Sequence, residues 1–202
     1  VMLLKFLLQA NCKNARSVKL SMKDCEFSDN TLRKNWLSTS LSIDELTLNR
    51  CSLKEIEDDA FASPIYEKTS KIIIANNKIS SLRKAMFRHL EELLKLLSLY
   101  GNVISTVDEK LFAGVSRIEA LYLHDSNVAT VSRDALKPIA SSVLLLTLNR
   151  NRITSLPEGV LDSVISPAKH FHVYVQDNPW HCDCNLKWMQ DFVEDHSGLI
   201  DN

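Results

Sequence analysis

Glycine and proline are scarce in this 202-residue chain, with four and five copies respectively. So little of either residue excludes a collagen-like chain, a low-complexity linker and a glycine-rich phosphate-binding loop. The 24 basic and 25 acidic residues nearly cancel, so no overall charge would hold nucleic acid or an anionic membrane. With 45% hydrophobic residues, the chain can bury the core of one domain or one array of repeats.

Long hydrophobic runs are also missing. No apolar run approaches the roughly 20 residues that a membrane-spanning helix needs. The nearest is VMLLKFLLQA at 1–10, which is short and contains Lys5. It is either the remnant of a secretory signal or the opening strand of the folded domain. We therefore predict no membrane span within this chain.

Common catalytic motifs do not occur either. The sequence has no G-x-S-x-G, H-E-x-x-H or G-x-x-x-x-G-K-[ST] pattern, and no nucleophile motif accompanies the six histidines. Asp125 follows His124, but neighbouring residues of a strand point to opposite faces, so this pair cannot form a dyad on one face. We predict no enzyme activity, no catalytic residue and no cofactor.

What the chain does contain is an internal repeat. The letters LTLNR occur at 46–50 and again at 146–150, and similar segments lie between and around them. Each segment has alternating apolar residues before one polar position, here called the anchor. The anchors are Cys25, Cys51, Asn77, Asn102, Ser126, Asn151 and Asn178. Successive anchors are 24 to 27 residues apart, so four repeats separate the two copies of LTLNR.

A second apolar pattern lies in the same register. Ten residues after five of the anchors the chain has phenylalanine or leucine, and thirteen residues after the later anchors it has an aliphatic residue. These positions are Phe61, Phe87, Phe112, Leu136 and Leu161, followed by Leu90, Val115, Ile139 and Val164. Two patterns in register through successive repeats indicate one structural unit copied several times.

The alternation before each anchor predicts a short strand with its leucines on one side. The chain turns at the anchor, where an Asn amide can satisfy backbone groups that the turn leaves unpaired in the interior. One repeat cannot enclose its own leucines, but stacked copies bury them in a continuous core.

This spacing and pattern resemble leucine-rich repeats. The resemblance implies an α/β solenoid, a curved horseshoe with a short parallel strand per repeat on its concave face and irregular or short helical limbs on its convex face. We predict about seven repeats over residues 18–177. The limb between Ser28 and Ser42 should be irregular, because Asn35 replaces the expected aromatic residue and Trp36 lies beside it.

The stretch NPWHCDCNLKWMQDF at 178–192 follows the last repeat. Its two cysteines lack further ligands at metal-site spacing, so we predict no metal site. The stretch resembles the C-terminal cap of extracellular leucine-rich repeat proteins, and the matching residues are Asn178, Pro179, Trp180, Cys182, Cys184, Leu186 and Trp188. The resemblance implies a short amphipathic helix at 187–194 and two further cysteines downstream. Because the chain ends at Asn202 first, either the cap at 178–202 is truncated or the partner cysteines lie outside this sequence.

The five cysteines are an odd number, so at least one is unpaired within the chain or paired outside it. We expect Cys25 and Cys51 to be buried reduced thiols at their anchors. Cys12 lies in 1–17, which should form an N-terminal cap or an irregular first coil. The resemblance at Cys182 and Cys184 implies an oxidising compartment, hence a secreted protein or the extracellular face of the plasma membrane. No N-x-S/T glycosylation site supports that location.

Solenoids of this type present their concave sheet, so residues between the core leucines are the first binding candidates. From Leu96 onward these positions gather aromatic residues, which suit interface anchors but also simply suit strands. The predicted binding residues are Tyr100, Tyr122, His124, Leu145, His172, Tyr174 and Gln176. If exposed, His124 and His172 would make binding pH-dependent.

These patterns predict a non-catalytic protein-recognition module of receptor, adhesion or immune type, whose partner is another protein. One alternative is a structural or stabilising subunit of a permanent secreted complex, including a complex with an enzyme. Another is an intracellular repeat protein, which would require free thiols at Cys182 and Cys184.

Overall fold

The structure is a computed structural model that describes residues 18–37, 42–83, 86–90, 93–112, 114–166 and 169–196. The predictions made for 1–17, including those for Cys12 and the apolar opening segment, lie outside the described residues. So do residues 197–202 of the expected cap.

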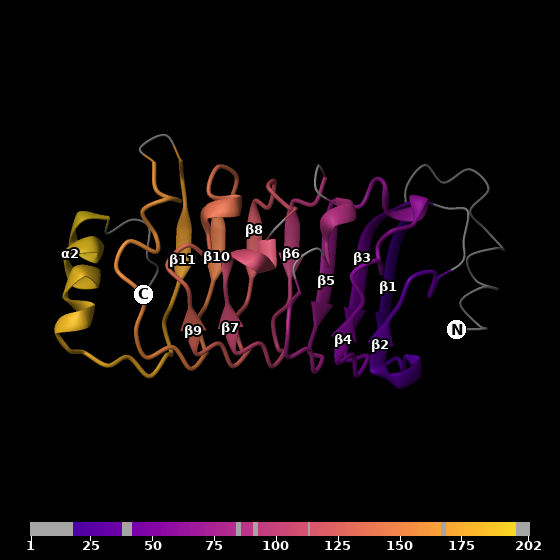
Figure 1. The fold of residues 1–202 in the computed structure, drawn as a ribbon, viewed down its shortest axis with the longest axis horizontal. Helices are drawn as coiled ribbons and strands as arrows, with labels where there is room; N and C mark the ends of the chain where they lie inside the picture. The colour runs from indigo at the N-terminus through magenta and orange to yellow at the C-terminus, as the bar shows by residue number, and fades with distance from the viewer. Residues whose placement is uncertain are drawn as a thin grey trace.

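A seven-stranded parallel sheet runs the length of the described chain, and its spatial order follows the sequence (Figure 1). The strands are β1 (Val18–Lys23), β3 (Ile43–Asn49), β5 (Lys71–Ala75), β6 (Leu96–Ser98), β8 (Ala120–Tyr122), β10 (Leu145–Thr147) and β11 (His172–Tyr174). Each strand ends two to four residues before an anchor. The predicted solenoid with one parallel strand per repeat is therefore confirmed, and its turns are called coils 1 to 7 below.

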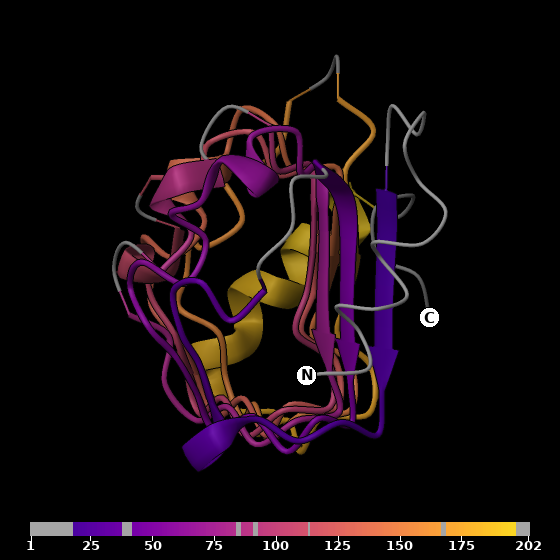
Figure 2. The same cartoon turned by 90° about the vertical axis from the view of Figure 1, so that its right-hand side faces the viewer.

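After each strand the chain crosses to the opposite side of the core and returns through short helical turns (Figure 2). The 3-10 turns are η1 (Ser28–Asn30), η2 (Pro64–Tyr66), η3 (Arg88–Leu90), η4 (Glu109–Phe112) and η5 (Lys137–Ile139). Two small parallel sheets join neighbouring limbs, β2 (Thr31–Leu32) with β4 (Glu55–Ile56) and β7 (Thr106–Val107) with β9 (Thr130–Val131). The limbs are thus short and irregular, as predicted.

The core fills the space between the sheet and these limbs. The second pattern of apolar residues, from Phe61 to Val164, is at most 2% exposed at all nine positions. Phe61 and Phe87 stack across neighbouring coils with ring centroids 5.7 Å apart. Burial of one such side chain stabilises the fold by about 1.5–3 kcal/mol. Both patterns read from the sequence therefore form one continuous core.

The first limb is irregular where the sequence predicts it. Asn35 has a φ of 58°, a left-handed conformation that asparagine tolerates better than most residues. The Trp36 ring packs edge-on against Phe27, with ring centroids 5.3 Å apart, and both contact the core. Trp36 therefore contributes an aromatic ring to the core side of this limb.

Asn151 shows what an anchor does. It is 8% exposed, and its Oδ1 accepts the N–H groups of Ser126 (2.9 Å) and Val128 (3.0 Å) from the preceding coil. Its Nδ2 donates to three carbonyl oxygens, those of Leu123 (2.9 Å), Leu148 (2.9 Å) and Asn149 (3.3 Å). Because these backbone groups are buried in the turns, solvent water cannot form the hydrogen bonds that the Asn151 amide provides. One side chain therefore joins the turns of two coils.

Asn77, Asn102 and Asn178 repeat this arrangement along the stack. In each case Nδ2 donates to a carbonyl of its own coil and to one of the preceding coil, at 2.7–3.0 Å. Ser126 has a shorter side chain at the same place, and its hydroxyl reaches the carbonyl oxygens of Leu99 and His124. The anchors thus form a column of hydrogen bonds parallel to the solenoid axis.

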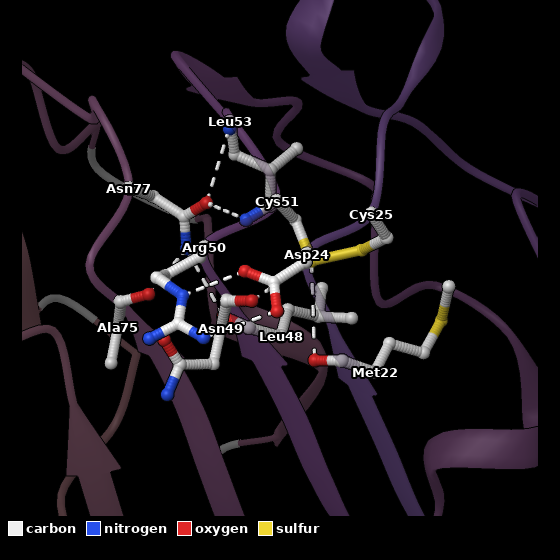
Figure 3. The surroundings of a disulfide bond; sticks show 10 residues. All are labelled: Met22, Asp24, Cys25, Leu48, Asn49, Arg50, Cys51, Leu53, Ala75 and Asn77. Atoms are coloured by element: carbon white, nitrogen blue, oxygen red, sulfur yellow. Dashed lines mark hydrogen bonds and ion pairs between the residues drawn. A yellow bond between two sulfur atoms is a disulfide. The ribbon is translucent and has the colours of Figure 1, made fainter.

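The prediction of reduced thiols at Cys25 and Cys51 is wrong. The two sulfur atoms form a disulfide, with an S–S distance of 2.02 Å (Figure 3). The parallel register pairs Lys23 with Asn49, two residues before each cysteine, so consecutive anchors lie side by side. Asn77 continues the column, because its Oδ1 accepts the N–H of Cys51 at 2.9 Å. A covalent bond therefore joins coils 1 and 2 where hydrogen bonds join the others.

A single α-helix, α2 (Lys187–Asp195), follows the short turn η6 (Cys184–Leu186) within the described residues. The predicted helix at 187–194 is thus confirmed, one residue longer. It lies beyond β11 and across the end of the core (Figures 1 and 2). Trp180 and Trp188 pack against the core, and Trp188 Nε1 donates to the carbonyl oxygen of Leu156 at 3.2 Å. None of the described helices has the length and apolar character to cross a bilayer.

We expect Asn151→Ala to lower the free energy of unfolding by about 2–4 kcal/mol, because buried N–H and C=O groups would lose their partner. Asn149→Ala is the matched control in the same coil. The Asn149 side chain faces outward, so its loss should cost less than about 0.5 kcal/mol. Urea denaturation followed by circular dichroism measures both. Equal losses in the two variants would contradict the proposed role of the anchor.

Candidate binding surface on the sheet

The sheet buries one side of each strand and presents the other to solvent, on the right of Figure 2. Residues three and five places before an anchor face the core, as Leu46 and Leu48 do at 0% exposure. Residues two, four and six places before an anchor lie on the opposite side, where all are at least partly exposed except the buried Ala75, Ser98 and Thr147. We call this outward surface the open face. It is the surface that the sequence predicts to be concave.

All seven predicted binding residues lie on the open face of coils 4 to 7. They are partly exposed: Tyr100, Tyr122, His124, Leu145, His172, Tyr174 and Gln176. The register places Thr147 between Tyr122 and Tyr174, and Leu145 beside His172. Residues that are up to 76 positions apart in the sequence thus form one continuous surface.

A ring stack lies at the centre of this surface. The Tyr100 and His124 rings are nearly parallel, at 8°, with centroids 4.7 Å apart. Tyr122 meets the same imidazole edge-on, with centroids 6.3 Å apart. Offset and edge-to-face arrangements of this kind are the favourable geometries for aromatic pairs. The stack therefore orders three side chains on neighbouring coils before any partner is bound.

His124 is also held from the side by Thr147. The Thr147 Oγ1 lies 2.9 Å from His124 Nδ1, within hydrogen-bond distance, and also accepts the N–H of Leu123 at 3.2 Å. Burial lowers the pKa of His124, while Asp125 opposes this shift and Arg150 adds to it. The ring is therefore neutral at pH 7 and presents no charge. The pH-dependent binding predicted for this residue moves to a more acidic range.

A further row of residues escaped the sequence analysis. The residue directly before each anchor has φ between 52° and 70° in all seven coils: Asp24, Arg50, Asn76, Gly101, Asp125, Arg150 and Asp177. We call this row the rim. The signal in the sequence was the constant offset and the restriction to polar residues or glycine, which favour left-handed turns. At Gly101 a Cβ atom would clash with Oδ1 of Asn76.

The arginine that ends each copy of LTLNR makes the same contact on the rim. Arg50 donates from Nε and Nη2 to both carboxylate oxygens of Asp24, at 2.7 and 3.1 Å. Arg150 makes the same two-bond contact with Asp125, at 2.8 and 2.9 Å. In both cases the arginine of one coil holds the aspartate of the preceding coil. These hydrogen bonds lower the pKa of Asp24 and of Asp125.

Coils 1 to 3 present a charged section of the open face. Glu45 on β3 bonds to Lys19 at 2.7 Å on one side and lies 3.7 Å from Lys71 on the other. Lys23 is exposed and has no ion pair among the described residues. Coils 4 to 7 carry no lysine, arginine, aspartate or glutamate at these outward positions. The open face is therefore charged at one end and uncharged and aromatic at the other.

The cap residues gather at the far end of the stack. Asn178 is the last anchor, and its Oδ1 accepts the N–H of Ile153 at 3.1 Å. Trp180 and the outer side of α2 line an apolar hollow of about 740 Å³. Cys182 and Cys184 border it, exposed and without a disulfide. No group of side chains in the described parts of the chain could hold a metal ion.

Residues 67–128 match the family model described as leucine rich repeat. This segment contains coils 3 to 5, whose strands and anchors form the parallel stack described above. The fold is a leucine-rich repeat solenoid. The family match and the structure agree, because the matched residues contain three complete strands of the stack at the spacing seen in the sequence.

The chain is also similar to parts of several known proteins. Leucine-rich repeat-containing protein 3B of Danio rerio is 34% identical over 93 residues, which is 46% of this chain and 34% of that protein. P-granule-associated novel protein 1 of Caenorhabditis elegans is 25% identical over 67% of this chain and 28% of that protein. Immunoglobulin superfamily member 10 of Homo sapiens is 33% identical over 60 residues, or 2% of its length. The matched part is thus about a third or less of each relative.

We predict that the pKa of His124 lies below 6.5 in the folded protein and rises towards 6.5 in Tyr100→Ala, because removing the stacked ring hydrates the imidazole. The neutral ring stabilises the fold above about pH 6.5, and that contribution is lost as pH falls through the folded pKa. Histidine ring NMR signals followed between pH 4 and 8 measure both values. An unshifted His124 in the wild type would contradict the burial argument.

Proposed function

We propose that this leucine-rich repeat solenoid is a non-catalytic protein-recognition module, of receptor, adhesion or immune type, that binds with coils 4 to 7 of its open face. The observation that carries the proposal is the ordered stack of Tyr100 and His124, edged by Tyr122, on an uncharged part of the sheet. Tyrosine combines a large contact area with a polar tip, and such residues carry much of the energy at protein interfaces.

The rigidity of this surface also supports recognition. Binding costs less entropy when the contacting side chains are already fixed in position. Here the hydrogen bond between His124 and Thr147 fixes the imidazole, and the register of the parallel strands fixes Tyr122 and Tyr174 on either side of Thr147. A partner would therefore meet a preformed surface.

A stabilising subunit of a permanent secreted complex is the second candidate. Exposed leucines favour it, because Leu93, three residues before β6, is 43% exposed and Leu144, directly before β10, is 42% exposed. A permanent partner would bury a wider and more apolar surface than a transient one. Washing a captured complex with 1 M salt distinguishes the two, since a broad apolar interface should persist.

We also propose that the protein works in an oxidising compartment, secreted or on the extracellular face of the plasma membrane. The Cys25–Cys51 disulfide supports this location, because such bonds persist where thiols are not kept reduced. Intact mass after alkylation without reduction should show Cys25 and Cys51 unmodified in protein from its natural source. Alkylation of both would favour the intracellular alternative.

Affinity capture tests the binding surface. We expect a variant with Tyr100, Tyr122, His124 and Tyr174 changed to Ala to lose a partner that the wild type retains from its source fluid or tissue. Truncation of two or more interface anchors typically costs above about 2 kcal/mol each, which reduces capture to background. Mass spectrometry identifies and quantifies the bound protein.

The control carries Lys54→Ala, Lys78→Ala and Arg152→Ala, which are exposed residues that follow the anchors and lie away from the open face. This control should capture the partner as the wild type does, and circular dichroism confirms that both variants are folded. Equal capture by the aromatic variant and the wild type would place recognition elsewhere on the molecule.

A further inference from the structure

The two ends of the open face differ in chemistry. At outward positions, coils 1 to 3 carry Lys19, Lys23 and Lys71 against one acid, Glu45. Lys19 and Lys71 both contact this glutamate, so Lys23 is the cation without an acidic partner among the described residues. At these positions coils 4 to 7 carry no lysine, arginine, aspartate or glutamate, and their only titratable side chains besides tyrosine are His124 and His172. A partner that covers the whole face must match both kinds of surface.

Arg50 adds donors at the charged end. Its Nε and Nη2 bond to Asp24, which leaves Nη1 for another acceptor. The pKa of Arg50 is raised, chiefly by its hydrogen bonds to Asp24, so the guanidinium carries its full charge. The register places Lys23 beside Asn49, the residue before Arg50. The spare donors of Lys23 and Arg50 therefore lie on neighbouring coils.

We infer that the open face binds an extended acidic segment of another protein that crosses the strands. Its carboxylates lie over Lys23 and Arg50, and its aromatic or aliphatic side chains lie on Tyr100, His124 and Leu145. Charge complementarity selects this occupant, because the outward and rim positions of coils 1 to 3 carry Lys19, Lys23, Lys71 and Arg50 against Glu45 and Asp24, whereas those of coils 4 to 7 carry Arg150 against Asp125 and Asp177. The inference rests on the proposed function, since it assumes that the aromatic end is a binding surface.

The dimensions suit a short segment. Six strand spacings of about 4.8 Å separate β1 from β11, which gives about 29 Å across the face. An extended chain rises about 3.3 Å per residue, so about nine residues span it. A peptide of 16 residues therefore covers both ends of the face.

The test is selection of 16-residue random peptides displayed on phage, with the wild-type solenoid as bait. We expect the enriched peptides to have acidic residues at one end and aromatic or aliphatic residues at the other. A synthetic copy of the most enriched peptide should bind Lys23→Glu at least about tenfold more weakly, since like charges then face each other. Lys78→Glu is the matched control, with the same charge change on an exposed lysine outside the open face, and should bind as the wild type does.

The double variant Tyr100→Ala, Tyr122→Ala separates this inference from the proposed function. If this variant loses the peptide but Lys23→Glu and Lys78→Glu bind equally, the aromatic surface stands and the acidic partner is wrong. If no peptide is enriched, or if none of the variants changes binding, an extended segment is not the occupant. Self-association of the wild type in sedimentation, abolished by the double variant, would overturn the inference in favour of a second copy of this chain.

Discussion

The structure depends on the need to satisfy backbone groups that each coil buries at the end of its strand. An asparagine anchor supplies two donors and an acceptor of matching geometry at that point, and it reaches the turn of the preceding coil as well as its own. The fixed turn then forces the residue before it into a left-handed conformation. Strand register, the rim and the rows of the open face all follow from this one contact.

Much of this arrangement could be predicted because it depends on position within a repeat. The offsets of Phe61, Phe87 and Phe112 from their anchors identify the core, and the alternation before each anchor identifies the strands. Contacts between coils were harder to predict, because they depend on which side chains the register brings together. The Cys25–Cys51 disulfide is such a contact. The sequence signal for this disulfide was the presence of cysteine at two consecutive anchors, which the parallel register of β1 and β3 makes neighbours.

The candidate site shows the same division. Its residues could be read from the sequence, since every second position before an anchor faces outward. The stacking of Tyr100 on His124 and the hydrogen bond between His124 and Thr147 depend on side-chain orientation, which no residue pattern encodes. The division of the open face into a charged end and an aromatic end becomes visible only when the coils are stacked. That division restricts the partners that fit.

Native-state hydrogen exchange tests the role of the anchor column most directly. The amides of Cys51 and Leu53 donate to Asn77, and those of Ser126 and Val128 donate to Asn151, although none of the four lies in a strand. If the anchors hold the coils together, these amides should exchange only by cooperative unfolding, as slowly as core strand amides such as those of Leu46 and Leu146. Exchange at the rate of exposed loop amides would contradict the account.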